Sequence, residues 1–377
     1  MKKNFLFGLL STLFCLLFNQ VVNPDKPEKG SWDLQMKKIW EIDSAGNDVF
    51  GDIQEINVTA DGKVFVLDAK NFRIFIFNKD GNFISAFGRR GEGPGEIKNL
   101  QMGSQLFIVG NRIIVVDRGR IHYFTREGKF IKTALYPFQT KPQTFVSEDV
   151  FISAPATIDD PRNSEAKVKL YNLKDKTEKV IATFKPYKKA TASEENRGNQ
   201  FIIAIIIDEI TPLMMVKYRE GKIYYGMSSH YLINVVNLQG KPITRFGIEG
   251  RKQNPISSAY KKKLAQQFKD APQEMVKKII NGLPETASFF YEIFIDKNGL
   301  AYLFISSPDS KSRKKLDIFS PEGKYIYSSE IRVDTGLTIK YFTLKNKWIF
   351  IATEDEEGNQ MVSKFSIKLP EVINTAK

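Results

Sequence analysis

The residue types that most often carry out chemistry are scarce in this sequence. Its two histidines, His122 and His230, fall in a predicted strand and a predicted turn far apart in the chain, so they do not supply the three nitrogen ligands of a usual zinc site. The single cysteine, Cys15, lies inside the most apolar segment, which excludes an intrachain disulfide and a thiolate metal cluster. Gly-x-Ser-x-Gly, the commonest signature of serine hydrolases, is absent.

Carboxylates offer the remaining route to a metal. Asp68 and Asp117 each end a predicted strand at matching positions, and together with Glu96 they could give oxygen ligands to calcium. An aspartate at such a position more often accepts hydrogen bonds from its own turn or from a nearby arginine, here Arg73 or Arg120. We favour the structural role and keep calcium as the alternative; no other cofactor is expected.

Positive charge is concentrated in one segment of a chain whose formal net charge is +13. Between Arg251 and Pro284, eight basic residues stand against two acidic ones, and Lys261, Lys262 and Lys263 are consecutive. Apolar residues recur there at helical spacing, which predicts a basic amphipathic helical hairpin. Such a hairpin could bind an acidic glycan, a membrane surface or an acidic partner protein, or it could pack on the rest of the protein with its lysines solvated.

Neither a nucleotide nor a nucleic acid is a favoured ligand. Arg89 and Arg90 precede three glycines, but no Gly-Lys-Ser/Thr follows and no helix is predicted to begin there. The chain also contains no basic and aromatic nucleic-acid motif.

The elements that position these residues are β-strands. Past residue 34, short runs of β-branched and aromatic residues are separated by turns that join an acidic or amide residue to glycine, such as Asp61-Gly62 and Asp80-Gly81. The clearest unit runs from Ile53 to Gly88 and is typical of four antiparallel strands joined by hairpins. Further copies are predicted at about 105–135, 144–184, 213–247, 288–331 and from 340 onwards, the last with three strands only.

The lone strand Met36–Ile42 can supply the fourth strand of the last copy and close a ring, which hides two sheet edges. The predicted fold is therefore all-β: a six-bladed β-propeller of four-stranded antiparallel blades, closed by an N-terminal strand. One helical-hairpin insertion is expected at 254–284, between blades four and five, with Asp270 capping its second helix and Pro272 in the first turn.

Two segments carry a family resemblance. Val64–Phe77 resembles the NHL repeat, an apolar strand ending in Asp, a short turn, then Arg and another strand. Phe87–Ile97, with its Gly-Pro-Gly-Glu, resembles the blade-to-blade connector of exported bacterial six-bladed propeller proteins, a group related to NHL and TolB-like propellers. The resemblance implies a propeller fold and export. Because most members of that group have no assigned activity, it implies little about function.

Antiparallel alternation places two kinds of loop on one face of a propeller: the blade-to-blade connectors and the turns between the second and third strands of each blade. We call this the connector face, and the opposite one the turn face. Ligands are expected on the connector face, whose loops are longer and more varied. Its candidate binding residues are Asp68, Arg73, Arg89, Arg90, Glu96, Asp117, Arg120, His230, Lys261, Lys262 and Lys263.

The chain begins with Lys2 and Lys3 followed by the apolar run Phe5–Phe18, an order that predicts export. We expect an export signal or N-terminal anchor over 1–22, a linker over 23–33, the propeller over 34–370 and a tail over 371–377. The hypothesis is a monomeric, non-catalytic binding protein of the periplasm, cell surface or extracellular space. The alternative is a calcium-dependent propeller enzyme of the lactonase or lyase kind.

Overall fold

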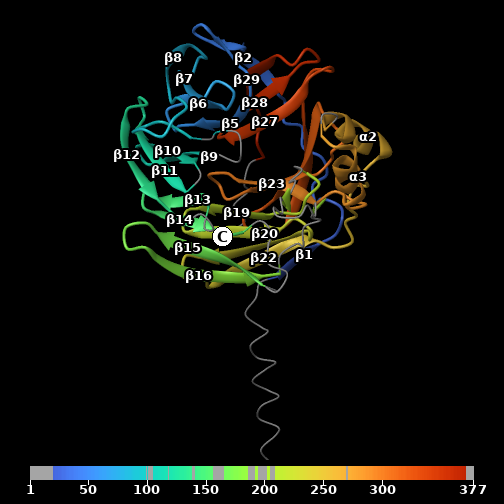
Figure 1. The fold of residues 1–377 in the computed structure, drawn as a ribbon. Helices are drawn as coiled ribbons and strands as arrows, with labels where there is room; N and C mark the ends of the chain where they lie inside the picture. The colour runs from blue at the N-terminus through green and yellow to red at the C-terminus, as the bar shows by residue number, and fades with distance from the viewer. Residues whose placement is uncertain are drawn as a thin grey trace, which may run out of the picture.

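The structure is a computed structural model, and it describes residues 20–98, 100, 105–117, 119–137, 141–155, 165–185, 192–193, 202–203, 209–268 and 271–370. Six sheets are arranged around one central axis (Figure 1). Each blade contains four antiparallel strands in chain order, with β2 completing the last, and the sheet of blade four has a fifth, parallel strand at its outer edge. The predicted six-bladed propeller is confirmed.

The blades follow one another along the chain. Blade one contains β5 (Ile53–Val58), β6 (Val64–Asp68), β7 (Arg73–Phe77) and β8 (Phe83–Phe87). Blade two contains β9 (Gln105–Val109), β10 (Arg112–Asp117), β11 (Arg120–Thr125) and β12 (Phe130–Leu135). Blade three contains β13 (Pro142–Ser147), β14 (Val150–Ser153), β15 (Ala166–Asn172) and β16 (Thr177–Phe184).

Blade four contains β19 (Met214–Arg219), β20 (Lys222–Met227), β21 (Leu232–Asn237) and β22 (Pro242–Ile248). Blade five contains β23 (Phe290–Ile295), β24 (Ala301–Ile305), β25 (Arg313–Phe319) and β26 (Tyr325–Arg332). Blade six contains β27 (Thr338–Lys345), β28 (Trp348–Glu354) and β29 (Gln360–Ser366), together with β2 (Lys37–Ile42). Two small sheets pair β3 (Ser44–Ala45) with β4 (Asp48–Val49), and β17 (Ala192–Ser193) with β18 (Ile202–Ile203).

The first strand of each blade lies nearest the axis. Going round the ring, β5 contacts β9, β9 contacts β13, β13 contacts β19, β19 contacts β23, and β27 contacts β5. The Tyr291 ring of β23 lies 6.4 Å from the Phe342 ring of β27. These strands therefore line the central channel, while β8, β12, β16, β22, β26 and β2 lie on the outside. Every second residue of a first strand can face the channel because strand side chains alternate.

Ring closure depends on β2, which pairs antiparallel with β29 from Lys37↔Ser366 to Ile42↔Val362. The Trp40 ring lies 5.8 Å from the Phe350 ring inside blade six. It also covers the turn at Gly81 in blade one, where a Cβ atom would come within 3.0 Å of the indole and φ is +87°. The predicted closure is confirmed, and one tryptophan joins the two blades that meet there.

Apolar side chains fill the interfaces between neighbouring blades. Phe87 of blade one lies 4.7 Å from Phe124 of blade two, measured between ring centroids. Phe246 of blade four lies 5.0 Å from Phe319 of blade five. Aromatic side chains of this size bury about 150–250 Å² each, so these contacts account for much of the stability of the ring.

Residues 20–33 run along the outside of blades four and five, and we call them the strap. Its first residues form β1 (Gln20–Asn23), which pairs in parallel with β22. Further on, the backbone N–H groups of Glu28 and Lys29 donate to the carbonyls of Tyr325 and Ile326, both at 2.9 Å. Residues 23–33 were assigned to a linker by sequence, yet hydrogen bonds join them to blade five. The predicted export segment overlaps β1 at residues 20–22, and residues 1–19 lie outside the described part.

The helical insertion is confirmed as α2 (Ser258–Gln267) and α3 (Gln273–Asn281), which lie at the rim of the propeller beside blade five (Figure 1). Leu264 and Ile279 are buried, so the apolar stripe of each helix packs inward. The second helix differs from expectation: its N-cap is Pro272, without a side-chain cap, and Asp270 lies outside the described residues. Among the described residues, no helix has the length and apolarity needed to cross a membrane.

Candidate channel site

The central channel holds a cavity toward each face of the propeller. The connector-face cavity has a volume of about 230 Å³ and is lined by residues of β19, β23 and β27, together with Glu209, Ser228 and Lys314. The turn-face cavity is larger, about 520 Å³, and is lined mainly by the far ends of the first strands. Glu292, Tyr341 and Phe342 line both cavities and mark the waist between them.

An internal ion pair stabilises the connector-face mouth. The Lys314 ammonium pairs with the Glu209 carboxylate, and the side chains are only 8% and 12% exposed. The other Glu209 oxygen accepts the Ser307 N–H at 2.8 Å, and the Lys314 ammonium lies 5.4 Å from the centre of the Tyr291 ring. These contacts tie the segment before β19 to blade five, so both charges are structural.

Three other lysines from three different elements approach one another beside this mouth. Lys340 on β27 lines the cavity, and it is joined by Lys263 on α2 and by Lys311 in the turn before β25. The Lys311 carbonyl accepts the Ile339 N–H at 2.9 Å, which places it next to Lys340. Partial burial, then the adjoining Lys311 ammonium and Lys340, lower the pKa of Lys263. The carboxylate of Glu354 pairs with Lys340 at 3.2 Å. The cluster carries more positive than negative charge and suits an anion.

The waist of the channel contains a carboxyl group with an unusual pKa. Glu55 accepts the Leu106 N–H at 2.6 Å and the Asn57 amide at 2.9 Å. Burial raises the pKa of Glu55 to about 7, although both hydrogen bonds act in the opposite direction. The Lys217 ammonium pairs with Glu292 at 2.8 Å, and burial together with the charges of Glu55 and Glu292 raises the pKa of the Tyr341 phenol.

The channel residues Glu55, Lys217, Glu292 and Tyr341 were not singled out from the sequence. A signal for one of them exists: in Ile53–Val58, Glu55 and Asn57 are polar residues two apart on a strand predicted to be half apolar. Which polar residues from different blades meet cannot be read from such a pattern, because it depends on how the blades are arranged about the axis.

The carboxylates considered for calcium are occupied by local hydrogen bonds. Asp68 accepts the N–H groups of Gly51 (2.8 Å), Lys70 (3.0 Å) and Asn71 (3.1 Å). Those bonds match the structural role that we favoured, but within the described residues no ion pair joins Asp68 to Arg73.

The other two carboxylates are each held within their own blade or connector. Asp117 pairs with Arg120 at 2.7 Å and accepts the Lys98 N–H at 2.8 Å. Glu96 pairs with Arg89 at 2.7 Å. Over the described ranges, no three His, Cys, Asp or Glu side chains are grouped so that they could hold a metal.

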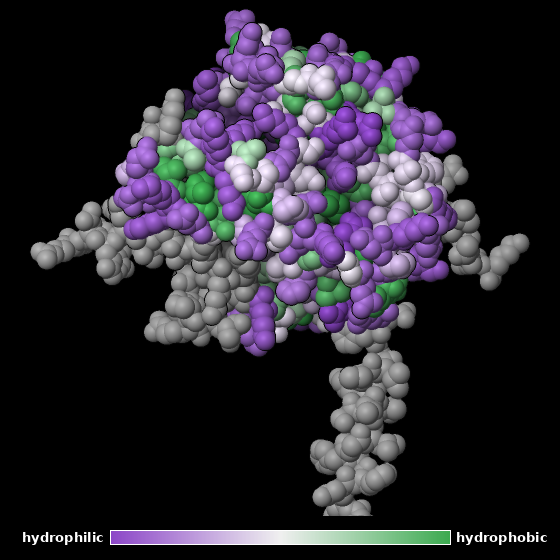
Figure 2. Space-filling view, turned by 90° about the vertical axis from the view of Figure 1, so that its right-hand side faces the viewer, coloured by the Kyte–Doolittle hydropathy of each residue, from purple (hydrophilic) through white to green (hydrophobic). Residues whose placement is uncertain are grey.

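The remaining predicted residues occupy separate places on the connector face. The Arg90 guanidinium lies 5.4 Å from the centre of the Phe72 ring, and the exposed His230 contacts Ser229 at 2.9 Å through Nδ1. Of the three consecutive lysines, Lys262 and Lys263 are exposed and Lys261 is half-buried, and Lys263 is the one whose pKa is lowered by Lys311 and Lys340. Figure 2 views the side that carries α2 and α3, and its surface is mostly hydrophilic.

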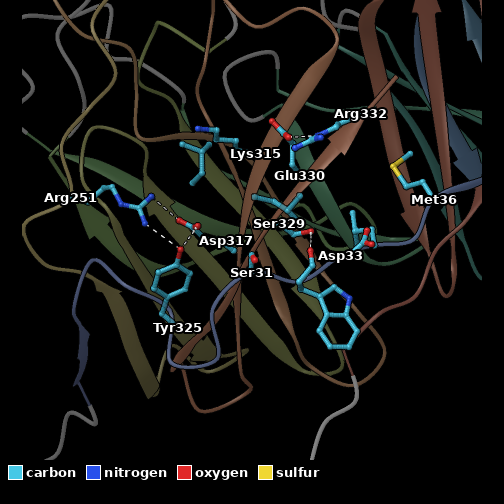
Figure 3. A pocket seen from close by; sticks show the side chains of 15 residues that line it. Ser31, Asp33, Met36, Arg251, Lys315, Asp317, Tyr325, Ser329, Glu330 and Arg332 are labelled. Carbon is cyan, nitrogen blue, oxygen red and sulfur yellow. Dashed lines mark hydrogen bonds and ion pairs between the residues drawn. The ribbon is translucent and has the colours of Figure 1, made fainter. Parts of the chain in front are cut away.

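Another cavity, about 820 Å³, lies between the strap and blade five (Figure 3). Its wall is a network centred on Asp317, which accepts the Tyr325 hydroxyl at 2.6 Å and pairs with Arg251 at 2.9 Å. Arg251 also pairs with Asp25 of the strap. Since these charges neutralise one another across three segments, the network serves to hold the strap in place, and the channel remains the better candidate for a ligand site.

Comparison with known proteins agrees with this architecture. The model of a family named DUF5128 and described as a 6-bladed beta-propeller matches residues 47–327. A "Putative exported protein" from Bacteroides fragilis is similar in structure, with 14% identity, a TM-score of 0.52, and coverage of 93% of this chain and 99% of that one. A DUF4221 family member from Bacteroides vulgatus gives 12% identity, a TM-score of 0.57, and coverage of 89% and 99%. No curated protein matches the sequence.

Proposed function

Because the chain belongs to the DUF5128 family of six-bladed β-propellers, we propose that it is an exported, non-catalytic protein that binds an acidic glycan at the connector-face mouth of its channel. A closed ring is a rigid scaffold on which loops present binding residues. Export is supported by the basic and apolar N-terminal pattern and by the relative from Bacteroides fragilis that carries the description of an exported protein.

The observation that carries the proposal is the approach of Lys263, Lys311 and Lys340 at the mouth. Like charges held together destabilise the free protein, and a polyanion that neutralises them relieves the repulsion. A glycan chain with a carboxylate on each sugar can reach several ammonium groups at once. We favour it over a membrane surface because the cluster borders a hollow that a flat layer of headgroups does not enter.

Affinity for polygalacturonate, measured at low and at physiological salt, tests the proposal with two charge-matched double variants. Lys263→Gln with Lys311→Gln removes two charges at the mouth, while Lys261→Gln with Lys262→Gln removes two elsewhere on α2. We expect the first pair to weaken binding about tenfold, from about 0.7 kcal/mol for each exposed charge, and the second by less than about twofold.

Two results would contradict the proposal. Equal losses in both pairs would show that only net charge matters, and equal binding of the wild type to neutral galactan would exclude an acidic ligand. Neither double variant should unfold at a lower temperature than the wild type, because none of these lysines has its side chain in the core and removing two charges at the mouth relieves repulsion.

A further inference from the structure

The turn-face end of the channel contains two cations, of which one has no partner among the described residues. Lys345, at the end of β27, and Arg219, at the end of β19, line the 520 Å³ cavity on either side of blade five. Within the described part of the chain, the Lys345 ammonium has neither an ion pair nor a hydrogen bond. Arg219 pairs with Glu220 through Nη2 at 3.0 Å, but its Nε–H is buried without an acceptor among the described residues.

The unpaired ammonium is the feature that a bound anion could relieve. A half-buried ammonium loses hydration, and within the described residues no carboxylate pairs with it. Burial, followed by the nearby charge of Arg219, lowers the pKa of Lys345. A carboxylate placed between the two side chains would pair with the Lys345 ammonium and with the exposed part of the Arg219 guanidinium.

Deeper in the cavity the lining becomes polar and mixed in charge. Asn57, Gln143 and Thr343 contribute amide and hydroxyl groups, and the Lys217–Glu292 pair lies at the waist. Such groups suit the hydroxyls of a small ligand, each of which can donate and accept a hydrogen bond. The cavity volume lies within the range of small-molecule sites, about 300–1,000 Å³.

We propose that the turn-face cavity is a second binding site, which takes a small polyhydroxylated carboxylic acid such as a sugar acid, with its carboxylate on Arg219 and Lys345 and its hydroxyls toward the waist. This site is separate from the connector-face mouth and does not rest on the function proposed above. It also lies on the face opposite the one that the sequence favoured for ligands.

Isothermal titration calorimetry with galacturonate tests the site, with galactose as the neutral probe of similar shape. We expect the wild type to bind galacturonate at least about tenfold more tightly than galactose. Lys345→Gln and Arg219→Gln should each weaken galacturonate binding at least about fivefold. Lys347→Gln, which removes an exposed charge from the next turn without lining the cavity, should stay within about twofold.

Three outcomes would overturn the assignment of the turn-face site. No galacturonate binding by the wild type up to about 10 mM, or equal affinity for galactose, would refute a carboxylate site. Unchanged binding in Lys345→Gln and Arg219→Gln would place the ligand elsewhere. Loss of galacturonate binding in the Lys263→Gln, Lys311→Gln double variant would place the galacturonate site at the connector face. If that double variant instead binds polygalacturonate as the wild type does, only the function proposed above is refuted, and the turn-face site is unaffected.

Discussion

The strap offers a sharp test of how the N-terminal segment is held, because one buried side chain connects three segments. Asn23 is 5% exposed. Its amide donates to the carbonyls of Gly247 and Gly323, both at 2.9 Å, and its oxygen accepts the Tyr325 N–H at 2.8 Å. Asn23→Ala therefore removes three buried hydrogen bonds between β1, blade four and blade five.

At about 1 kcal/mol for each bond, the variant should lose about 3 kcal/mol of unfolding free energy. An unfolding entropy of about 2.1 cal/mol/K per residue, applied to 377 residues, converts this loss into a fall of about 4 °C in the melting temperature. Circular dichroism measures the melt. Asn82→Ala, at an exposed position whose side chain makes no such contact, is the matched control and should melt with the wild type.

Detachment of the strap alone would appear as faster proteolysis rather than as a lower melting temperature. Trypsin cleavage after Lys29 reports on it, since the Lys29 N–H donates to Ile326 in the intact protein. If Asn23→Ala neither melts earlier nor is cut faster after Lys29 than the Asn82→Ala control, the strap is not held by these bonds and the reasoning fails.

Two further predictions concern buried charges. The pKa of Glu55 is raised to about 7 from 4.5, so at pH values between these two the folded state binds more protons than the unfolded state. The free energy of unfolding must therefore fall as pH rises from about 5 to about 8, by up to about 3 kcal/mol. Denaturant unfolding at both pH values should show a smaller fall in Glu55→Gln; an identical fall would refute the assignment. Lys314→Met leaves Glu209 buried without its partner and should cost about 3–5 kcal/mol, while adding Glu209→Gln should recover much of that loss. A double variant as unstable as the single would contradict the ion pair.

Much of the fold could be predicted because its signals are local. Asp61-Gly62 and Asp80-Gly81 mark hairpins by backbone chemistry alone, and Gly62 and Gly81 adopt the positive φ values, +91° and +87°, that such turns require. Closure by β2 followed from counting strands, since a three-stranded last blade leaves an edge that one spare strand can cover.

The candidate site was less predictable because its contacts join residues far apart in the chain. Glu55 meets Leu106 across 51 positions, and Asn23 meets Tyr325 across 302. Asp68 shows the same limit at short range: Arg73 lies opposite it in the strand register, yet the backbone of Gly51 provides one of its hydrogen bonds. Alternation of strand directions determines the face on which a loop lies, but not which side chains converge on the axis.

The distances between the cations at each channel mouth depend on closure of the ring, whereas the distances between side chains of a single loop would not. Lys263, Lys311 and Lys340 come from the insert and from blades five and six, and Lys345 and Arg219 come from blades six and four. No blade contributes a complete site, so the separation of the charges is set by packing between blades. If the two proposed anion sites exist, the Trp40 contact with blade one and the Asn23 contacts with blades four and five should act on both at a distance. Loosening either contact would let the cations move apart, and we expect it to weaken anion binding.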